Sequence, residues 1–280
     1  MGLKDKLDRI LTEPYEPALN EYRSTVDAYV IVDVFDGVHQ QGVRSFVHSY
    51  YSQYIFNEIY LYPATTIKTA EKDLDRITAI DDAGSIKWNW PLTPEDEKLD
   101  MLTGLTKECL VDHIPAALIN QTMSHVRLWD VCIKKNEPIA ILNSNMAVRR
   151  KIDMRYIQER GFNNGVVSLN CLNEETKNNQ YLHDRLEEQF GARTQMPQMY
   201  PTPSLQFAEI GISKPQPFPG HGAYIITPWA ARKAFDVIQQ VGLWPVQFLF
   251  CRQLFPWTYI MWPQAVDSKK SLSPTQRLKK

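Results

Sequence analysis

The chain has 280 residues, of which 44% are hydrophobic and 22% charged, and its formal net charge at pH 7 is -1. This length and apolar content are enough to bury a sizeable core, and they exclude a disordered polyelectrolyte. The near-zero net charge excludes a surface that attracts polyanions over its whole area. No apolar run reaches the ~18 residues that span a bilayer, and residues 1–6 lack a signal core, so we expect a cytoplasmic protein without a membrane span.

The cysteines and the two ends of the chain give little indication of a functional site. The four cysteines lie far apart and in no Cys-x-x-Cys pattern, which argues against structural zinc or a disulfide framework. Residues 1–20 place leucines at helical spacing before two prolines, which predicts an N-terminal helix and a linker. Residues 266–280 predict a basic flexible tail, either a solvated terminus or a grip for phosphate.

The first part of the chain alternates strand and helix patterns. The β-branched run at residues 29–34 predicts a buried strand, and an apolar stripe over residues 43–54 predicts the helix that follows. Further strands are predicted at residues 57–62 and 76–80, and the second of these ends at Asp81. This alternation predicts an α/β fold with a mainly parallel sheet and helices on both faces.

The middle of the chain contains the first candidate site. Residues 93–96 predict a helix start, with Thr at the N-cap and Pro in the first position. A helix over residues 121–135 then precedes a short apolar strand at 138–142, and residues 165–170 predict another strand. Ligands of open α/β sheets bind outside the carboxyl ends of the strands, so we expect chemistry at the loop over residues 143–146.

The last third of the chain contains an irregular region, followed by a strand and a helix with clear start and stop signals. Residues 171–218 are polar and poorly periodic, which predicts a variable loop with one helix near residues 181–190. A strand at residues 223–226 then leads into a helix that Thr227 caps and that stops near Gly242.

Four segments resemble a known family when they are taken together. Residues 120–129 are similar to an Ala-Leu-Ser-His-x-x-Leu-Trp helix, and the apolar strand at 138–142 follows at the same distance. Residues 219–233 are similar to a glycine, strand and helix segment, and residues 79–81 to an Ala-Val-Asp turn. In this order they resemble the family 25 glycosyltransferases, including short phage-borne members.

The resemblance extends over residues 29–265 and implies a GT-A-like, Rossmann-like architecture. We expect a single glycosyltransferase domain over residues 21–265. Its nucleotide-binding half would lie at about 21–150 and its acceptor half at about 151–265. The resemblance implies a nucleotide-sugar donor as the bound cofactor.

Three positions depart from the family pattern. Asn143-Ser144-Asn145 stands where the family has Glu-Asp-Asp or Glu-His-Asp, and Gln247 stands where it has the Asp of Pro-x-Asp. The first strand, which ends in Asp33-Val34, lacks the family's Asn. Amides and a hydroxyl offer neutral oxygens, whereas hard divalent cations prefer anionic ones. We therefore expect no metal here, unless other residues supply ligands for Mn²⁺ or Mg²⁺.

Donor binding would then rest on neutral and cationic groups. The loop residues would hydrogen-bond the donor sugar or ribose, and the arginines after the loop would bind the diphosphate bidentately. The alternative for these arginines is a solvated basic patch. The expected donor-binding residues are Asn143, Ser144, Asn145, Arg149, Arg150, Gln247, Gly220 and Gly222.

A general base must deprotonate the acceptor hydroxyl. His221 lies between two glycines that let the backbone approach a ligand, and Asp33 and Asp81 are carboxylates at predicted strand ends. Strand-end carboxylates also occur as solvated turn formers. His125 shares a helix face with apolar residues, so we interpret it as a core histidine. The expected catalytic residues are His221, Asp81 and Asp33.

Two functions fit these observations. The first is a metal-independent glycosyltransferase whose acceptor is a glycan or a modified base of phage DNA. Tryptophans would stack on either acceptor. The second is a pseudoenzyme that serves as a binding or regulatory subunit, as a homo-oligomer or paired with an active homologue. The tryptophans expected to contact the acceptor are Trp88, Trp90, Trp257 and Trp262.

Overall fold

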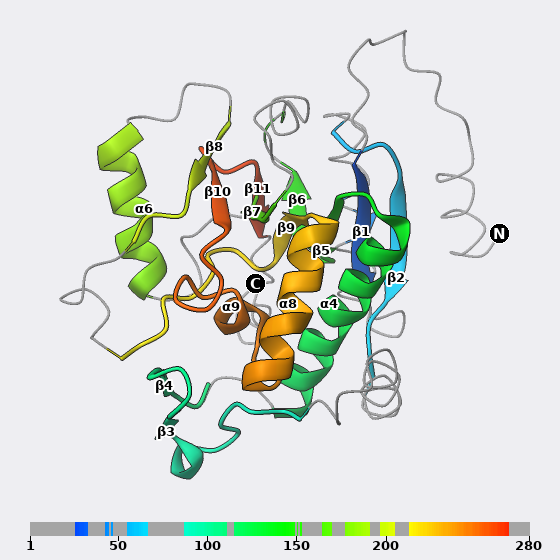
Figure 1. Cartoon of the computed structure of the whole chain (residues 1–280). Helices are drawn as coiled ribbons and strands as arrows, with labels where there is room; N and C mark the ends of the chain where they lie inside the picture. The colour runs from blue at the N-terminus through cyan, green and yellow to red at the C-terminus, as the bar shows by residue number, and fades with distance from the viewer. Residues whose placement is uncertain are drawn as a thin grey trace, which may run out of the picture.

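The computed structural model of the chain describes the following residues: 26–32, 43–44, 46, 55–66, 87–110, 115–148, 150, 152, 164–169, 177–190, 197–204 and 213–268. Within them a seven-stranded sheet has the order β2-β1-β5-β9-β7-β10-β8 (Figure 1). The strands are β1 (Asp27–Val32), β2 (Ile59–Pro63), β5 (Ile139–Asn143), β7 (Val166–Ser168), β8 (Gln198–Pro201), β9 (Ala223–Ile226) and β10 (Thr258–Trp262).

The sheet is mixed, with most strands pointing one way. β1 pairs in parallel with β2 and with β5, and β7 pairs in parallel with β10. β9 is antiparallel to both β5 and β7, and β8 is antiparallel to β10. The predicted mainly parallel α/β sheet is therefore confirmed. Because β9 runs against β5, it begins at the edge of the sheet where β5 ends.

Alternate residues of each strand face opposite sides of the sheet. Ile139 and Ile141 of β5 belong to one buried cluster, and Ala140 and Leu142 belong to the other. The second cluster also contains Val43 and Phe46, which have helical backbone, and residues of β6 (Met146–Val148) and β11 (Val266–Ser268). Helices thus cover both faces of the sheet, as predicted.

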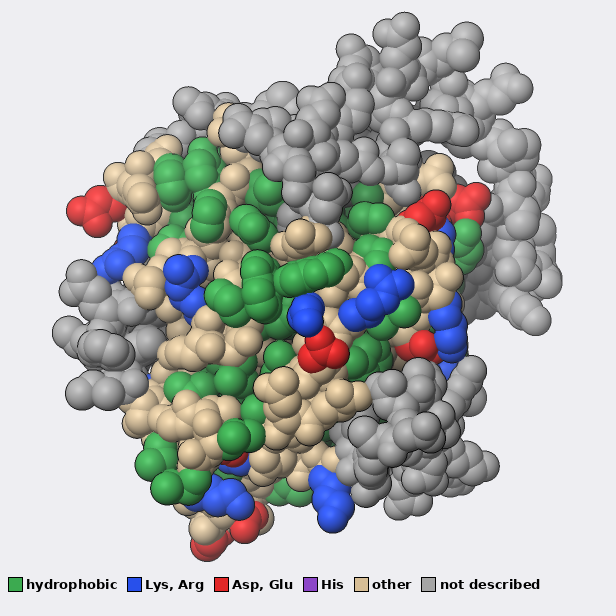
Figure 2. Space-filling model, in the orientation of Figure 1, with side chains coloured by type: hydrophobic (Ala, Val, Ile, Leu, Met, Phe, Trp, Pro, Cys, Tyr) green, Lys and Arg blue, Asp and Glu red, His purple; other side chains and the backbone are tan. Residues whose placement is uncertain are grey.

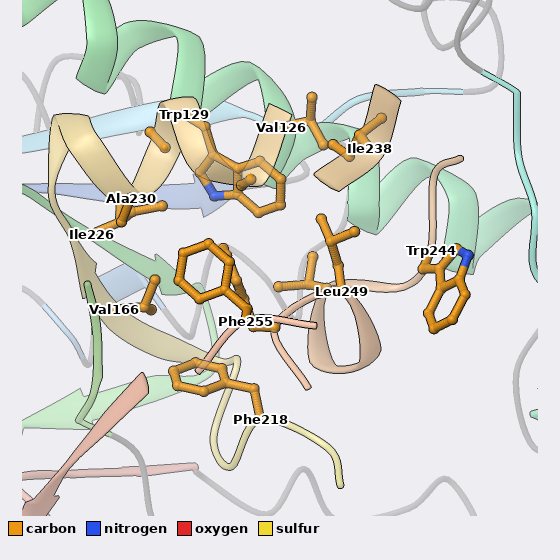
Figure 3. Packing of buried hydrophobic residues seen from close by; sticks show 14 of the residues in the cluster. Val126, Trp129, Val166, Phe218, Ile226, Ala230, Ile238, Trp244, Leu249 and Phe255 are labelled. Atoms are coloured by element: carbon orange, nitrogen blue, oxygen red, sulfur yellow. The ribbon is translucent and has the colours of Figure 1, made fainter. Parts of the chain in front are cut away.

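Two long helices cover the first face. α4 (Pro115–Lys135) and α8 (Pro228–Val241) lie side by side in Figure 1. Figure 3 shows Val126 and Trp129 of α4 facing Ala230 and Ile238 of α8, and the Trp129 ring packs on Phe250 with centroids 5.0 Å apart. α4 begins at Pro115, six residues before the predicted start at residue 121. Burial of these apolar side chains is the main source of stability for this layer.

α8 has the predicted caps. The Thr227 hydroxyl accepts a hydrogen bond from the Ala230 N–H at 3.2 Å. At the other end the Gly242 backbone has φ 80°, in the left-handed region that favours glycine. A Cβ at Gly242 would also lie 2.9 Å from the Lys87 carbonyl oxygen. The end of α8 is therefore fixed tightly against the segment that begins at Lys87.

The helix start predicted at residues 93–96 is present, but the helix does not continue. Only the 3-10 turn η1 (Pro94–Asp96) forms, and the Thr93 side chain makes no capping bond to the backbone. The backbone becomes extended at Glu97 and enters the antiparallel hairpin of β3 (Lys98–Leu99) and β4 (Thr106–Lys107). The cap residues are correct for a helix, but the tertiary pairing of the hairpin overrides them.

The C-terminal part of the sheet has its own helix. α6 (Lys177–Phe190) contains the helix predicted near residues 181–190, and its Leu186 packs with Ile260 and Trp262. The short helix α9 (Val246–Leu249) precedes β10. β11, whose residues were assigned to the flexible tail, pairs with β6. The predictions for residues 1–20, 76–80 and 269–280 lie outside the described residues.

Candidate active site

The predicted Asn-Ser-Asn loop and the predicted glycine turn meet at one edge of the sheet. The backbone N–H of Asn143, the last residue of β5, donates to the carbonyl of Gly222 at 2.7 Å. Leu142 and Ala223 are paired in the register of β5 and β9. Residues that lie far apart in the sequence therefore adjoin one another where ligands bind in open α/β sheets.

The loop offers neutral groups to a ligand. Asn143 is half-buried, Ser144 is buried and Asn145 is exposed. Amide and hydroxyl groups both donate and accept hydrogen bonds, but they carry no negative charge. Among the described residues no three His, Cys, Asp or Glu side chains form a group that could hold a metal ion. The side chains of this loop therefore supply no anionic oxygen, which is the kind of ligand that a hard divalent cation prefers.

The glycine turn depends on its first residue. Gly220 has φ 70°, and its carbonyl accepts a hydrogen bond from the Ala223 N–H at 3.3 Å. A residue with a Cβ would be strained in this conformation. His221 follows and is half-buried, and Nδ1 of its imidazole is buried. The turn places this side chain immediately before β9.

A buried polar cluster lies beneath the turn. The Tyr224 hydroxyl is 2.9 Å from Nδ1 of His125 and accepts a 2.9 Å hydrogen bond from Nε1 of Trp129. An indole N–H only donates, so the arrangement that gives the hydroxyl hydrogen an acceptor directs it to Nδ1, with the proton of neutral His125 on Nε2. Burial lowers the pKa of His125 to about 3, with a further contribution from the charge of His221. His125 is a core histidine, as predicted.

This pKa makes the stability of the protein depend on pH. Unfolded histidine binds a proton near pH ~6.5, whereas folded His125 does so only near pH 3, so acid favours the unfolded state between these values. We expect the free energy of unfolding to fall by up to about 1.4 kcal/mol per pH unit through this window. Urea unfolding at pH 7, 5.5 and 4 measures the fall. Replacing His125 with Asn should make it shallower, and an equal slope in both proteins would contradict the assignment.

The Ser-His-x-x-Leu-Trp motif is explained by packing. The Ser124 hydroxyl donates to the Asn120 carbonyl and accepts from the Thr65 N–H, both at 2.8 Å, which ties α4 to the segment after β2. Leu128 is fully buried, and the His and Trp of the motif both bond Tyr224 of β9. The motif fixes α4 on the sheet.

For the other predicted site residues the structure gives backbone contacts or no description. The Gln247 carbonyl in α9 accepts from the Phe218 N–H at 2.7 Å, two residues before the glycine turn. Arg150 is half-buried, and its N–H donates to the Ala265 carbonyl at 3.2 Å. Asp33, Asp81 and Arg149 lie outside the described residues.

The prediction of four tryptophan contacts is wrong for two of them. Trp90 stacks on Phe248 with ring centroids 4.3 Å apart, and Trp262 belongs to the buried cluster of α6. Trp88 is partly buried against the main core, whereas Trp257 is exposed. Large aromatic side chains add most stability when they are buried, so two of these rings serve the core.

A buried ion pair was not predicted. Nζ of Lys107 donates to Asp100 at 2.8 Å and to the side-chain oxygen of Asn89 at 2.7 Å, and the lysine side chain is 1% exposed. The Asn89 amide in turn donates to the Val241 carbonyl at 2.6 Å. The pair thus fixes the β3–β4 hairpin to the end of α8. Figure 2 shows hydrophobic side chains at the lower left over this hairpin, where Leu99, Met101 and Leu102 are exposed.

The chain has an α/β fold whose mostly parallel sheet places the loop after β5 beside the turn before β9. The chain belongs to glycosyltransferase family 25 (LPS biosynthesis protein), whose model matches residues 101–250. Among solved structures, the chain is similar to mouse xyloside xylosyltransferase 1 in its apo form, with 9% identity over 81% of each chain and a TM-score of 0.38. No curated protein matches the sequence. Within the described part of the chain, no helix is long and apolar enough to cross a membrane.

Proposed function

We propose that the protein transfers a sugar from a nucleotide-sugar donor to an acceptor hydroxyl, without a metal ion at the loop after β5. Membership of family 25 supports glycosyl transfer. The observation that carries the proposal is the hydrogen bond between Asn143 and Gly222, which joins the amide loop to the histidine turn at the ligand edge. The two segments provide neutral binding groups and a candidate base side by side.

The reaction has two chemical requirements at this site. The leaving diphosphate must be stabilised, and the acceptor hydroxyl must lose a proton as the oxocarbenium-like centre forms. In our proposal Arg149 and Arg150 take the diphosphate through bidentate hydrogen bonds, and Asn143, Ser144 and Asn145 hold the sugar or ribose. His221 accepts the proton, and Asp33 and Asp81 are the alternative bases.

Nucleotide binding tests the first half of the proposal. Thermal shift and calorimetry with uridine and cytidine diphosphates and their sugars, each with Mn²⁺ and with a chelator, measure binding and its metal dependence. We expect one nucleotide to raise the melting temperature equally in both conditions. Binding that appears only with Mn²⁺ would contradict the metal-free site. If no nucleotide binds, the pseudoenzyme is the better description.

A carboxylate restored in the loop tests the same point. Asn145→Asp should not raise turnover with Mn²⁺, because Asn143 and Gln247 would still leave the ion short of anionic ligands. It should lower turnover modestly, since a negative charge is added beside a diphosphate. Initial rates with and without Mn²⁺ measure the effect, and Asn145→Gln is the neutral control. A rise of about tenfold with Mn²⁺, or ~1.4 kcal/mol of barrier, would contradict the prediction.

We propose a carbohydrate hydroxyl as the acceptor. The net charge of -1 does not indicate a phosphate-binding surface. Modified DNA is the alternative, and the two differ in their response to salt. Binding of DNA should weaken with a slope of about -0.9 in log K against log salt for each phosphate contacted, whereas a neutral glycan should show almost no slope.

A further inference from the structure

The histidine beneath the glycine turn has a feature that packing does not explain. His125 is fully buried, and among the described residues its Nε2 has no hydrogen-bond partner. A buried polar group without a partner costs about 1 to 3 kcal/mol. An apolar side chain of similar size would avoid this cost. The unpartnered nitrogen itself therefore adds no stability at this position.

The contact that His125 does make leads to the glycine turn. Its ring stacks on Tyr224 with centroids 5.6 Å apart and planes at 19°, and its Nδ1 receives the hydroxyl hydrogen. Tyr224 is the second residue of β9, and His221 lies three residues before it. The intervening Ala223 donates to the Gly220 carbonyl. A shift of the tyrosine ring would therefore move the backbone from which His221 projects.

Trp129 alone cannot fix the tyrosine hydroxyl. It donates to the oxygen and leaves the direction of the hydroxyl hydrogen unset. Nδ1 of His125 is the acceptor that sets this direction. The low pKa of His125 keeps the ring neutral at every pH above about 3, and in the tautomer with the proton on Nε2 its Nδ1 is able to accept. The contact therefore persists throughout the range in which an enzyme of this kind would be assayed.

We propose that His125 is a positioning residue that orients His221 toward the loop after β5, through the hydroxyl of Tyr224 and the first residues of β9. The catalytic consequence rests on the proposed function. His125 itself touches no ligand, because it is fully buried. Its removal should lower kcat by tenfold to a hundredfold and leave the KM for the nucleotide sugar unchanged, since misplacement by about 1 Å costs up to ~10²-fold.

A set of four variants tests this position. His125→Asn keeps an acceptor near Nδ1 and should retain most of kcat, whereas His125→Leu should lose it. Tyr224→Phe removes the hydroxyl and should lose as much as His125→Leu, and the double variant should lose no more than either one, because the two residues act as a unit. Trp129→Phe is the control, since it removes the other bond to the hydroxyl and leaves the tyrosine–histidine contact in place.

Two kinetic results would contradict the positioning role. A kcat for His125→Leu no lower than that of Trp129→Phe would overturn the proposal, and so would a proportional rise in KM. Amide hydrogen exchange of His221, Gly222 and Ala223 supplies a readout that needs no turnover. It should accelerate in His125→Leu and stay unchanged in His125→Asn. If the natural protein transfers no sugar, the proposed function is contradicted. The positioning role is contradicted separately, if the amides of His221, Gly222 and Ala223 exchange at equal rates in all variants.

Discussion

Replacing His221 with glutamine is expected to lower kcat by about 10²- to 10⁴-fold, the usual contribution of a general base. Glutamine keeps a hydrogen-bonding group of similar length but does not accept a proton near neutral pH. His221 lies in the turn whose Gly222 carbonyl accepts from the Asn143 N–H, so we expect the lost step to be proton transfer rather than donor binding. Steady-state kinetics with a nucleotide sugar and its acceptor measure the loss.

The specificity of this effect needs two comparisons. The dissociation constant of the nucleotide and the melting temperature should stay close to those of the natural protein, because His221 is only half-buried and glutamine has a similar length. Asp33→Asn and Asp81→Asn test the other candidate bases in the same assay. If His221→Gln retains kcat within about threefold while one Asp variant loses it, the base is that carboxylate.

Replacing Lys107 with methionine is expected to lower the free energy of unfolding by about 3 to 5 kcal/mol. Methionine fills a similar volume but removes the cation that Asp100 and Asn89 both bond. Asp100 is only 10% exposed, so its charge would remain largely buried without a cation, held only by the N–H groups of Leu102 and Thr103 and the Thr103 hydroxyl. Denaturant unfolding at pH 7 measures the loss, and its midpoint should shift without a change in m-value.

Two further variants separate the ion pair from ordinary surface effects. Lys98 pairs with Lys107 in the hairpin register but is exposed, so Lys98→Met should change stability by no more than about 0.5 kcal/mol. The double variant Asp100→Asn with Lys107→Met should recover part of the loss, because no buried charge remains. An equal loss in the single and double variants would argue against the ion pair.

The ion pair between Lys107 and Asp100 should also make the free energy of unfolding depend on pH in acid. Burial raises the pKa of Asp100, but the hydrogen bonds from Lys107 and Thr103 outweigh it and hold the pKa below its usual range. Stability from this carboxylate is therefore complete above its unfolded pKa of about 3.9 and is lost as the pH falls through the lower folded value. Lys107→Met should lack this loss.

Local signals made part of this fold predictable. The strand and helix around Thr227 were correct because a capping threonine, a proline in the first helical position and a terminal glycine act over a few residues. The strand before Asn143 was correct because a short apolar run cannot form a surface helix. The expectation that Asn143 lies at a strand end followed directly from these elements.

Other features depend on contacts that no local pattern encodes. The direction of β9 is set by its two neighbours, so its start could not be placed beside Asn143 from the sequence alone. Lys107 was missed because lysine is almost never fully buried unless it is paired, and nothing in the sequence marks Asp100 as its partner. The helix that starts at Pro94 ends after one 3-10 turn because the chain then pairs in the β3–β4 hairpin, which the local helix-start signal does not encode.

The position of β9 between β5 and β7 determines when the sheet can be completed during synthesis on the ribosome. A nascent chain that has emerged only as far as residue 222 contains both neighbours of β9 but not the strand that joins them. Until Ile226 leaves the exit tunnel, the facing edges of β5 and β7 are unpaired and apolar, which is the state that chaperones protect. Truncated products that end before β9 should accordingly precipitate, whereas chains extended through β10 should stay in solution.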